Sequence, residues 1–480
     1  MGSELRLRRS IPVAGLAAVL MFVAAVLPAA EAGAEERIAR SPDNPWYWQY
    51  GGRPVLLLGG SNQDNPFNHP DLDGDLEESL DRLAAAGGNT TRNTMSSRDA
   101  GNVFPFSRGE DGRFDLAQWN AEYWDRFERF LRWTHAREII VQIEIWDPWD
   151  YHHDHYDQGG WSRSPFNPEK NVNYTAAETG LPTAIDYPPA ERPTEHSFFH
   201  TVPELEDNGV VLRWQEAFVA KILEHALEYP HVLYCTGNEM GEPVEWDAYW
   251  ARFVLAKAAE QDMAVEVTAM RRNSNITAAD HRYIYQRPQT FTFLDIAQNN
   301  AVSGPLQGRR ILEVRNYLAA IDGGPRPLNN NKIYHASDEA LHRFWRIVFC
   351  GGASARFHRP RPASMLGGWG LSAESERALR AARQVEAAFD FFTAEPRPDL
   401  VRSEGEAWLL AQPGQQYAVY LPEGSPAELS LEGDAARWTV RWLNLDDLTW
   451  HDGPTAAAPT AEIRPPASGA WIGVVTAANR

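Results

Sequence analysis

The feature that most constrains the fold is an alternation of short apolar runs with longer amphipathic stretches, repeated eight times between about Arg53 and Glu395. Short apolar segments that alternate with helical patterns are typical of βα units built around a parallel sheet. Eight units favour a closed (β/α)8 barrel over an open sheet, and such a barrel needs about 250 residues. The chain has 480 residues, which is enough for this barrel and one additional small domain.

The expected strands are short, and most of them are followed by a helix. We expect strands at Val55–Leu58, Asn89–Thr94, Glu138–Trp146, Val232–Thr236, Ala264–Met270, Thr290–Ala297, Pro327–Tyr334 and Ala353–His358, the first of them ending at Gly59-Gly60. We expect helices at Leu76–Ala86, Trp119–Ala136, Val210–Glu228, Glu245–Gln261, Gly308–Ile321, Asp338–Phe349 and Ser372–Thr393. The long loop 147–208 follows the third strand, so it is expected to cover the carboxyl ends of the strands, where barrel enzymes place their active sites.

The pattern changes to period two from about Arg397. Short runs such as Ala407–Leu410 and Tyr417–Leu421, separated by Gly, Pro, Asn and Asp, predict a small antiparallel β-sandwich. The Pro- and Ala-rich stretch Pro454–Pro466 is expected to be one long loop. We therefore divide the chain into a signal peptide (1–34), an α/β barrel (35–396) and a C-terminal β-sandwich (397–480).

The N-terminus has the layout of a secretory signal, because three arginines precede the apolar run Ile11–Leu27 and small residues follow at Ala30–Ala34. A membrane anchor is the alternative, since the run is near the lower limit for spanning a bilayer. Cleavage would leave no stable membrane span and a secreted or periplasmic protein. The formal net charge of −20 argues against partners such as nucleic acid or anionic lipid. Cys235 and Cys350 lie in apolar segments and are expected to be buried, unpaired thiols, a disulfide between them being the alternative.

Charged side chains stand near the ends of several expected strands. Strand side chains alternate between two faces, and Glu144 and Trp146 share the parity opposite to the apolar, helix-facing residues of strand three, so both are expected to point into the barrel. A buried carboxylate is costly unless it is paired or hydrogen-bonded, which makes Glu144 and Asp295 candidates for function. Arg356 and His358 share one face of strand eight and are expected to meet these carboxylates, with a purely structural salt-bridge network as the alternative.

The most specific segment is Tyr229–Glu239, where apolar strand four stops on Gly-Asn-Glu directly before a loop. Here the chain resembles the cellulase-like glycoside hydrolases of clan A, in which strand four ends in Asn-Glu and this Glu is the acid/base. The resemblance implies that Glu239 is the acid/base and that Asn238 and Arg92 belong to the substrate site. It covers nearly the whole chain after residue 34, because Asn44–Trp48, Val55–Gly59 and Gly414–Leu421 are similar to a family of cellulase-like barrels whose C-terminal sandwich is often labelled collagen-binding.

The expected seventh strand departs from the pattern of that clan. Its retaining enzymes carry a nucleophilic Glu at the end of strand seven, whereas Arg326–His335 contains no acid and Lys332 or a neighbouring Asn takes the position. Glycosidic cleavage normally needs two carboxyl groups. With Glu239 as the acid, the candidates for the second are Glu144 and Asp295, and Glu144 is preferred for its aromatic neighbour. Lys332 would lower the pKa of a nearby acid or hold the carboxylate of an acidic sugar, and an ion pair with one of these acids is the alternative.

Aromatic residues gather after strands three and eight, and they suit stacking on sugar rings or ordinary packing of a long loop. His152–His155 has metal-ligating residue types, but adjacent loop side chains diverge, and Asp71–Asp75 lacks the calcium-loop spacing, so neither a metal nor a cofactor is predicted. The residues expected to bind substrate are Arg92, Asn93, Trp146, Asp147, Asn238, Lys332, Arg356, His358 and Trp369.

Two functional hypotheses follow. The first is an exported glycoside hydrolase that cleaves O-glycosidic bonds of a poly- or oligosaccharide, with Glu239, Glu144 and Asp295 as its catalytic residues. The second is a non-catalytic carbohydrate-binding barrel, because the strand-seven Glu is absent. Adhesion to a matrix polymer through the C-terminal sandwich is a third possibility, against which we favour a structural role for that domain.

Overall fold

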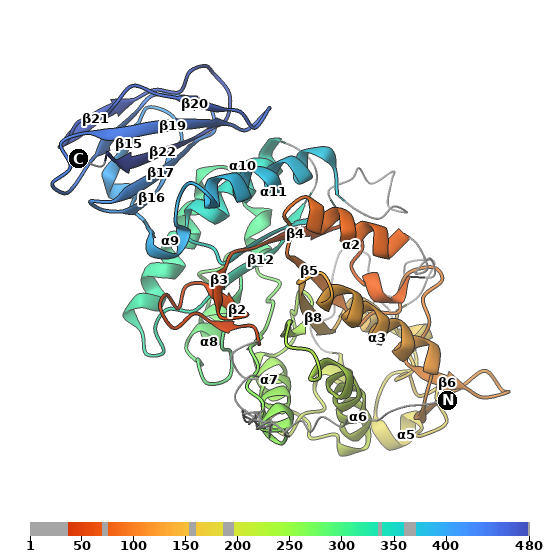
Figure 1. Cartoon of the computed structure of the whole chain (residues 1–480). Helices are drawn as coiled ribbons and strands as arrows, with labels where there is room; N and C mark the ends of the chain where they lie inside the picture. Colours follow the sequence, from red (N-terminus) through yellow and green to blue (C-terminus); the bar gives the residue numbers. More distant parts are fainter. Residues whose placement is uncertain are drawn as a thin grey trace, which may run out of the picture.

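The computed structural model describes residues 37–69, 75–152, 160–185, 196–334, 338–359 and 371–478. The expected signal peptide, Trp369, the segment 71–74 and the histidine-rich residues 153–155 lie outside the described residues. Two bodies, a barrel and a β-sandwich, lie side by side in the described part of the chain (Figure 1).

The barrel is a ring of eight parallel strands, and their spatial order follows their order in the sequence. The chain of strand pairings begins at β10 and ends at β11, and these two strands are joined by Thr292, whose backbone N–H donates to the carbonyl of Val267 at 2.8 Å. The Thr292 hydroxyl oxygen accepts from the N–H of Val267, also at 2.8 Å. The ring therefore closes, which confirms the (β/α)8 fold. Its strands are β4 (Leu57–Ser61), β5 (Thr90–Thr94), β8 (Ile140–Trp146), β9 (Val232–Gly237), β10 (Val267–Thr268), β11 (Leu294–Asp295), β12 (Leu328–Tyr334) and β13 (Ser354–His358).

Amphipathic helices surround the ring and bury their apolar faces against it; α10, for example, buries Phe344, Ile347 and Val348. Every helix expected from the sequence is present, and the seven-residue α8 between strands β10 and β11 is an addition. The main helices are α2 (Asp75–Ala85), α3 (Ala121–His135), α6 (Gly209–Ala226), α7 (Val244–Ala259), α8 (Ala279–Tyr285), α9 (Pro305–Ala320), α10 (Asp338–Phe349) and α11 (Ala373–Glu386).

Two boundaries near the start of the barrel differ from the prediction. Strand β4 does not stop at Gly59-Gly60 but continues through both glycines to Ser61. The reason is close approach to β5, because a Cβ atom on Gly59 would lie 1.9 Å from the carbonyl oxygen of Thr90.

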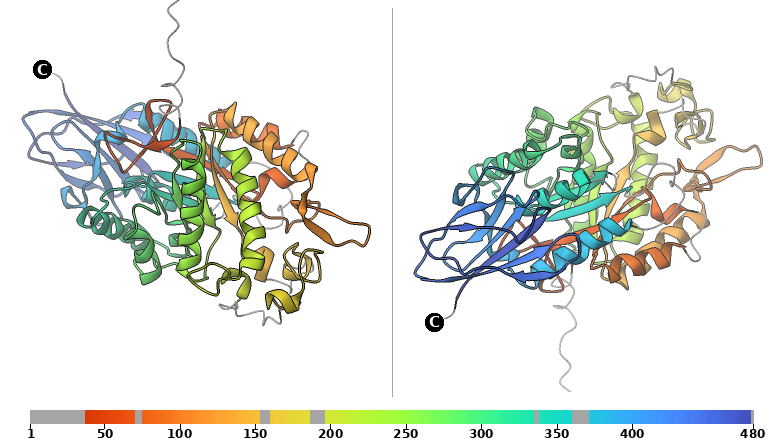
Figure 2. Two further views of the ribbon diagram at one scale, coloured as in Figure 1. Left: turned by 90° about the horizontal axis from the view of Figure 1, so that it is seen from below. Right: turned by 90° about the horizontal axis from the view of Figure 1, so that it is seen from above.

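The expected helix at Trp119–Ala136 begins two residues late, since its first residue belongs to strand β7 (Phe114–Trp119). Strand β7 pairs with β6 (Phe106–Arg108), and Figures 1 and 2 show this hairpin projecting from the barrel. Asn120 ends the hairpin and caps α3, because its side-chain oxygen accepts from the N–H of Glu122.

The C-terminal domain is an antiparallel sandwich of a six-stranded and a three-stranded sheet, with spatial orders β14-β16-β17-β22-β19-β20 and β15-β18-β21. The prediction of one loop over Pro454–Pro466 is wrong, because β21 lies inside it and pairs with β18. The Pro- and Ala-rich composition of this stretch hides a four-residue strand that buries only Ile463. The strands are β14 (Glu395–Pro396), β15 (Val401–Ser403), β16 (Trp408–Gln412), β17 (Gln416–Leu421), β18 (Ala427–Ser430), β19 (Trp438–Asn444), β20 (Trp450–Asp452), β21 (Thr460–Ile463) and β22 (Trp471–Ala477).

The six-stranded sheet packs on helix α10 of the barrel (Figures 1 and 2). The ring of Tyr420 lies 5.8 Å from that of Phe349, centroid to centroid, and 6.0 Å from that of Trp345. Glu406 accepts hydrogen bonds from Arg346 at 2.5 and 2.9 Å across the same interface. Since buried side chains of both bodies form one apolar cluster, the sandwich stabilises the barrel.

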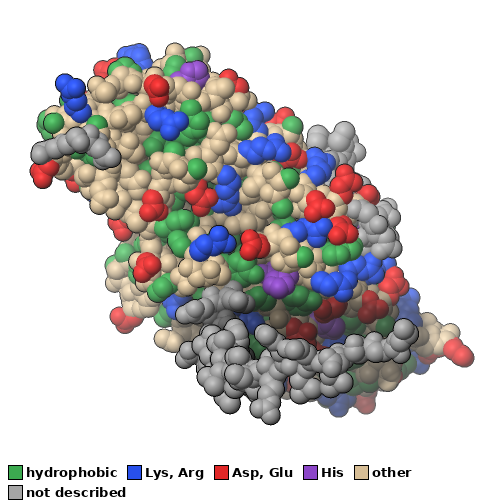
Figure 3. Space-filling view, in the orientation of Figure 1, with side chains coloured by type: hydrophobic (Ala, Val, Ile, Leu, Met, Phe, Trp, Pro, Cys, Tyr) green, Lys and Arg blue, Asp and Glu red, His purple; other side chains and the backbone are tan. Residues whose placement is uncertain are grey.

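The remaining general expectations concern the cysteines and the membrane. Cys235 and Cys350 are both buried and free, as the sequence predicted. In the described ranges no helix combines the length and the hydrophobicity that crossing a bilayer requires. The face shown in Figure 3 carries basic and acidic side chains interspersed, without a large patch of one sign.

Candidate active site

An ion pair between Glu239 and Lys332 occupies the carboxyl end of the barrel. Glu239 follows β9, and Lys332 lies on β12, the seventh barrel strand. The Lys332 Nζ atom donates to Oδ1 of Asn238 at 2.5 Å and to Oε1 of Glu239, which also accepts from the hydroxyl of Tyr334 at 3.4 Å. The Lys332 side chain is 2% exposed and that of Glu239 is 14% exposed. The seventh barrel strand, which contains no acid, thus presents an ammonium that pairs with Glu239.

The backbone fixes Glu239 in an uncommon conformation. Its φ angle is 52°, in the left-handed region that residues other than glycine rarely adopt. Such conformations cost on the order of 1–3 kcal/mol and gather at functional sites. The flanking N–H groups anchor the turn, because Asn238 donates to the carbonyl of Trp146 and Met240 to that of Met270, each at 2.8 Å. The strained residue is therefore held by its neighbours on both sides.

Glu144 is the first of two further carboxyl groups inside the barrel. It is fully buried, and its Oε2 atom accepts from Nη2 of Arg92. Its Oε1 atom has no hydrogen-bond partner in the described part of the structure. Burial raises the pKa of Glu144, and the charges of Arg92 and Lys332 oppose this rise.

Asp295 is the second, and its hydrogen bonds are complete. Its Oδ2 atom accepts from Gln142 at 2.8 Å and from Asn331 at 3.1 Å, and its Oδ1 atom accepts from the N–H of Ala297 at 2.8 Å. Burial raises the pKa of Asp295, against these hydrogen bonds and the charge of Lys332. Lys332 therefore acts electrostatically on all three candidate carboxyl groups, directly on Glu239 and at longer range on the other two.

Asp64 is a central residue of the site that the sequence analysis missed. Its Oδ1 atom lies 3.2 Å from Nε2 of His358 and accepts from Arg92 at 3.3 Å, while its Oδ2 atom accepts from Arg98 and Arg359. Burial alone would raise the pKa of Asp64, but these four groups hold it well below its usual range. Asp64 lies in the polar run Asn62–Asn65 directly after β4, so the rule that drew attention to the other strand ends would have found it.

The network around Asp64 extends to Glu239. Arg98 donates to Oδ2 of Asp147 at 2.5 Å, and Oδ1 of Asp147 accepts from Nδ2 of Asn238 at 3.2 Å. Asn238 in turn accepts from Lys332, the partner of Glu239. Hydrogen bonds and ion pairs therefore link Glu144, through Arg92 and the Asp64 cluster, to Glu239.

Most of the predicted site residues lie in this network. Contrary to the sequence prediction, Arg356 and His358 do not bond Glu144 or Asp295 within the described residues. Arg356 donates to the carbonyl of Asn331 at 2.7 Å and to the hydroxyl of Ser61, and His358 pairs with Asp64. Burial and the neighbouring Arg92 lower the pKa of Arg356 to about 9. The predicted residues that the structure brings together are Arg92, Glu144, Asp147, Asn238, Glu239, Asp295, Lys332, Arg356 and His358.

Two predicted substrate-binding residues lie elsewhere. Asn93 faces away from the barrel interior, since its side-chain oxygen accepts from the N–H of Phe67 at 3.2 Å. Trp146 does not share the inward direction of Glu144. Its fully buried ring packs against Trp250 and Trp246 of α7 and Phe218 of α6, at centroid distances of 5.1, 5.7 and 5.5 Å. Sequence parity failed here because the strand ends at Trp146 and its ring turns to the helix layer.

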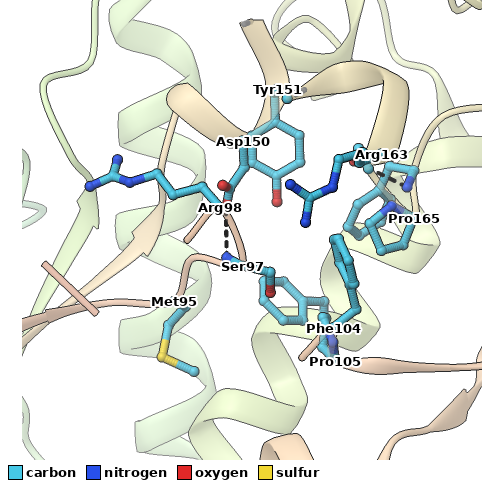
Figure 4. A pocket seen from close by; sticks show the side chains of 13 residues that line it. Met95, Ser97, Arg98, Phe104, Pro105, Asp150, Tyr151, Arg163 and Pro165 are labelled. Carbon is cyan, nitrogen blue, oxygen red and sulfur yellow. Dashed lines mark hydrogen bonds between the residues drawn. The ribbon is translucent and has the colours of Figure 1, made fainter. Parts of the chain in front are cut away.

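Two aromatic residues of the loop after β8, Tyr151 and Trp161, also pack against other side chains. Tyr151 stacks on Phe198 at 4.3 Å, and Trp161 is fully buried. A cavity beside them is lined by Arg98, Asp150, Tyr151, Arg163 and Phe104, among others (Figure 4). Its volume of about 20 Å³ accommodates one water molecule and excludes a sugar ring.

No group of three or more His, Cys, Asp or Glu side chains within the described ranges is arranged to hold a metal ion. The described site is instead built from carboxyl groups paired with guanidinium and ammonium groups. The described residues thus form a closed barrel with this cluster at the carboxyl ends of its strands and with Asn-Glu after the fourth strand.

Comparison with solved structures leads to the same fold. A protein described as a glycoside hydrolase superimposes with a TM-score of 0.64 and 12% identity, over 93% of this chain and 98% of its own. A glycoside hydrolase family 5 protein from Bacteroides vulgatus ATCC 8482 gives a TM-score of 0.63 and 13% identity, over 92% and 94%. No family model and no curated protein matches the chain. The chain thus shares its fold with these two glycoside hydrolases.

Proposed function

We propose that the protein is an exported glycoside hydrolase that cleaves O-glycosidic bonds of a poly- or oligosaccharide, with Glu239 as general acid/base. The observation that carries the proposal is the placement of Glu239 after the fourth strand of a barrel that shares its fold with glycoside hydrolases. Glu239 is also the most exposed of the three candidate carboxyl groups and is held in left-handed backbone geometry. Export is proposed from the N-terminal sequence pattern alone.

The reaction needs one group that protonates the leaving oxygen and a second carboxylate that attacks the sugar or activates water. Glu144 is the better candidate for the second group, because its Oε1 atom makes no hydrogen bond to described residues. Both oxygens of Asp295 are already used in hydrogen bonds. In the free protein Nζ of Lys332 is bonded to Oε1 of Glu239, so a bound substrate must separate the pair before Glu239 donates a proton to the leaving oxygen.

A panel of polysaccharides and the variant Glu239→Gln test this proposal. General acid/base groups typically contribute 10²–10⁴-fold to the rate, so release of reducing sugar should fall by at least about 100-fold in the variant. Glu462→Gln is the matched control, because Glu462 is an exposed residue of the sandwich, and it should keep full activity. Absence of product from the whole panel, or full activity of Glu239→Gln, would rule the proposal out.

A second candidate function is favoured by one specific observation. Because Lys332 stands where the strand-seven acid is expected and pairs with Glu239, the barrel is also suited to bind glycan without cleaving it. Affinity electrophoresis separates the two functions. Retention of wild-type protein and Glu239→Gln by the same glycan, without product from either, would establish the binding function instead.

A further inference from the structure

Two guanidinium groups converge on one carboxylate oxygen at the rim of the site. Arg98 and Arg359 both donate through Nη2 to Oδ2 of Asp64, and their side chains are 17% and 40% exposed. Asp64 also pairs with Arg92 and His358, so it receives four donor groups, which is about the capacity of an ionised carboxylate. Asp64 therefore has no capacity left for the remaining N–H groups of these two partly buried arginines.

Arg359 is the less satisfied of the two. Arg98 has a second carboxylate partner in Asp147, whereas Asp64 is the one carboxylate that pairs with Arg359 in the described part of the chain. A guanidinium group has five N–H donors, and in Arg359 one of them is used in this pair. Two like charges that share one oxygen repel each other, so a further anion at this point would be stabilising.

The arginine pair lies within reach of a ligand that touches Glu239. The N–H of Arg359 donates to the carbonyl of Ser61 at 3.2 Å, which places it between the ends of β13 and β4. The ring of Tyr334 packs edge-on against His358 at 4.6 Å between centroids, and its hydroxyl reaches Glu239. One tyrosine and one histidine therefore separate Glu239 from the Asp64 cluster, so a glycan lying across the barrel mouth can touch both.

Resting on the proposed glycosidase function, we propose that Arg359 and Arg98 form a carboxylate subsite and that the substrate is a glycan containing uronic acid residues. The planar fork of arginine matches a carboxylate with two parallel hydrogen bonds, which a neutral sugar does not offer. The chain carries a formal net charge of −20, so its overall field repels a polyanion. Selection for the uronate must then come from these two local cations.

The test measures binding by the Glu239→Gln protein, so that no substrate is consumed. The probes are polygalacturonate and its highly methyl-esterified form, which have the same backbone and differ in the charge of the carboxyl group. Affinity electrophoresis or calorimetry should show at least tenfold tighter binding to polygalacturonate. Adding Arg359→Gln should remove this preference, and Arg359→Lys should reduce it several-fold because the planar fork of the guanidinium is lost. The matched control is Arg402→Gln, because Arg402 is an arginine of β15 whose side chain is 86% exposed, and this variant should keep the preference.

Three results would overturn the inference: equal binding of the charged and esterified polymers, an unchanged preference in both Arg359 variants, or binding to sulfated dextran alone. Melting curves of each variant identify any that fail to fold, and Arg359→Lys, which keeps the charge, then decides the question. Uronate binding without hydrolysis by wild-type protein would support the subsite and refute the proposed function. Hydrolysis confined to neutral glycans would support the proposed function and refute the subsite.

Discussion

Replacing Lys332 by methionine removes the cation on which the candidate site depends. The ammonium is buried, bonds Asn238 and Glu239, and acts on Glu144 and Asp295. Removing one partner of a buried ion pair costs about 3–5 kcal/mol, because the other charge stays buried without compensation. Since the Glu239 side chain keeps 14% of its exposure, we expect the lower end of this range, roughly 3 kcal/mol at pH 8.

The loss of stability in Lys332→Met should grow as the pH rises, because of the buried acids Glu144 and Asp295. Burial raises the pKa of Glu144 and of Asp295, and without Lys332 both values rise further. A carboxyl group whose pKa is higher in the folded than in the unfolded state stabilises the fold at pH values below its unfolded pKa of about 4. This contribution disappears as the pH rises through its pKa in the folded state. Lys332→Met should therefore be nearly as stable as wild type at pH 4 and most destabilised at pH 8.

Urea unfolding followed by tryptophan fluorescence at pH 4 and pH 8 measures both effects. The control is Lys221→Met, which removes a surface pair with Glu224 on helix α6 and should change stability by less than about 1 kcal/mol. A loss below about 1 kcal/mol in Lys332→Met at pH 8, or an equal loss at both pH values, would refute the reasoning.

Three further substitutions test other parts of the structure. Asp64→Asn should lower the free energy of unfolding by roughly 3 kcal/mol at pH 7 in urea titrations. Because its partners hold the pKa of Asp64 below its usual range, this loss of stability should shrink as the pH falls below about 4. Burial, helped by the charge of Asp147, raises the pKa of Asp150 to about 7. Asp150 therefore stabilises the fold below pH 4 or so, its approximate unfolded pKa, and this contribution is lost as the pH rises through about 7. Asp150→Asn should flatten the change of melting temperature between about pH 5 and 8. Gly59→Ala should cost at least about 1–3 kcal/mol, whereas Gly209→Ala, with open space around its Cβ position, should be neutral or stabilising in the same melting assay.

The barrel was predictable because each strand is a short apolar run and each helix has an amphipathic period. The errors lie where a residue serves the packing of neighbours rather than its own element. Gly59-Gly60 looks like a stop signal, yet these glycines continue β4 because β5 passes too close for a side chain. Strand β21 was hidden by its Pro- and Ala-rich surroundings, since its pairing with β18 depends on residues about thirty positions away.

The candidate site was predictable to the extent that strand ends mark it. Glu144, Glu239 and Asp295 were found because each is a carboxylate at the end of an apolar strand. An ion pair of Lys332 with one of these acids was expected as an alternative, but the sequence did not say which acid, since the contact with Glu239 joins residues 93 positions apart and exists only in the closed ring. Asp64 was missed although it closely follows β4, because its importance comes from four groups on other segments.

The cation on the seventh strand changes how acid and base roles can be divided. Two carboxyl groups take different roles when their surroundings favour different protonation states. Here Lys332 pairs with Glu239, while burial raises the pKa of Glu144, whose Oε1 atom makes no hydrogen bond to described residues. In the free protein Glu144 is therefore suited to hold a proton, whereas the function proposed above needs it as the second carboxylate and needs Glu239 as the acid. Glu239 becomes the acid only when substrate breaks its pair with Lys332. The basic limb of the pH–activity profile therefore reports which carboxyl group donates the proton.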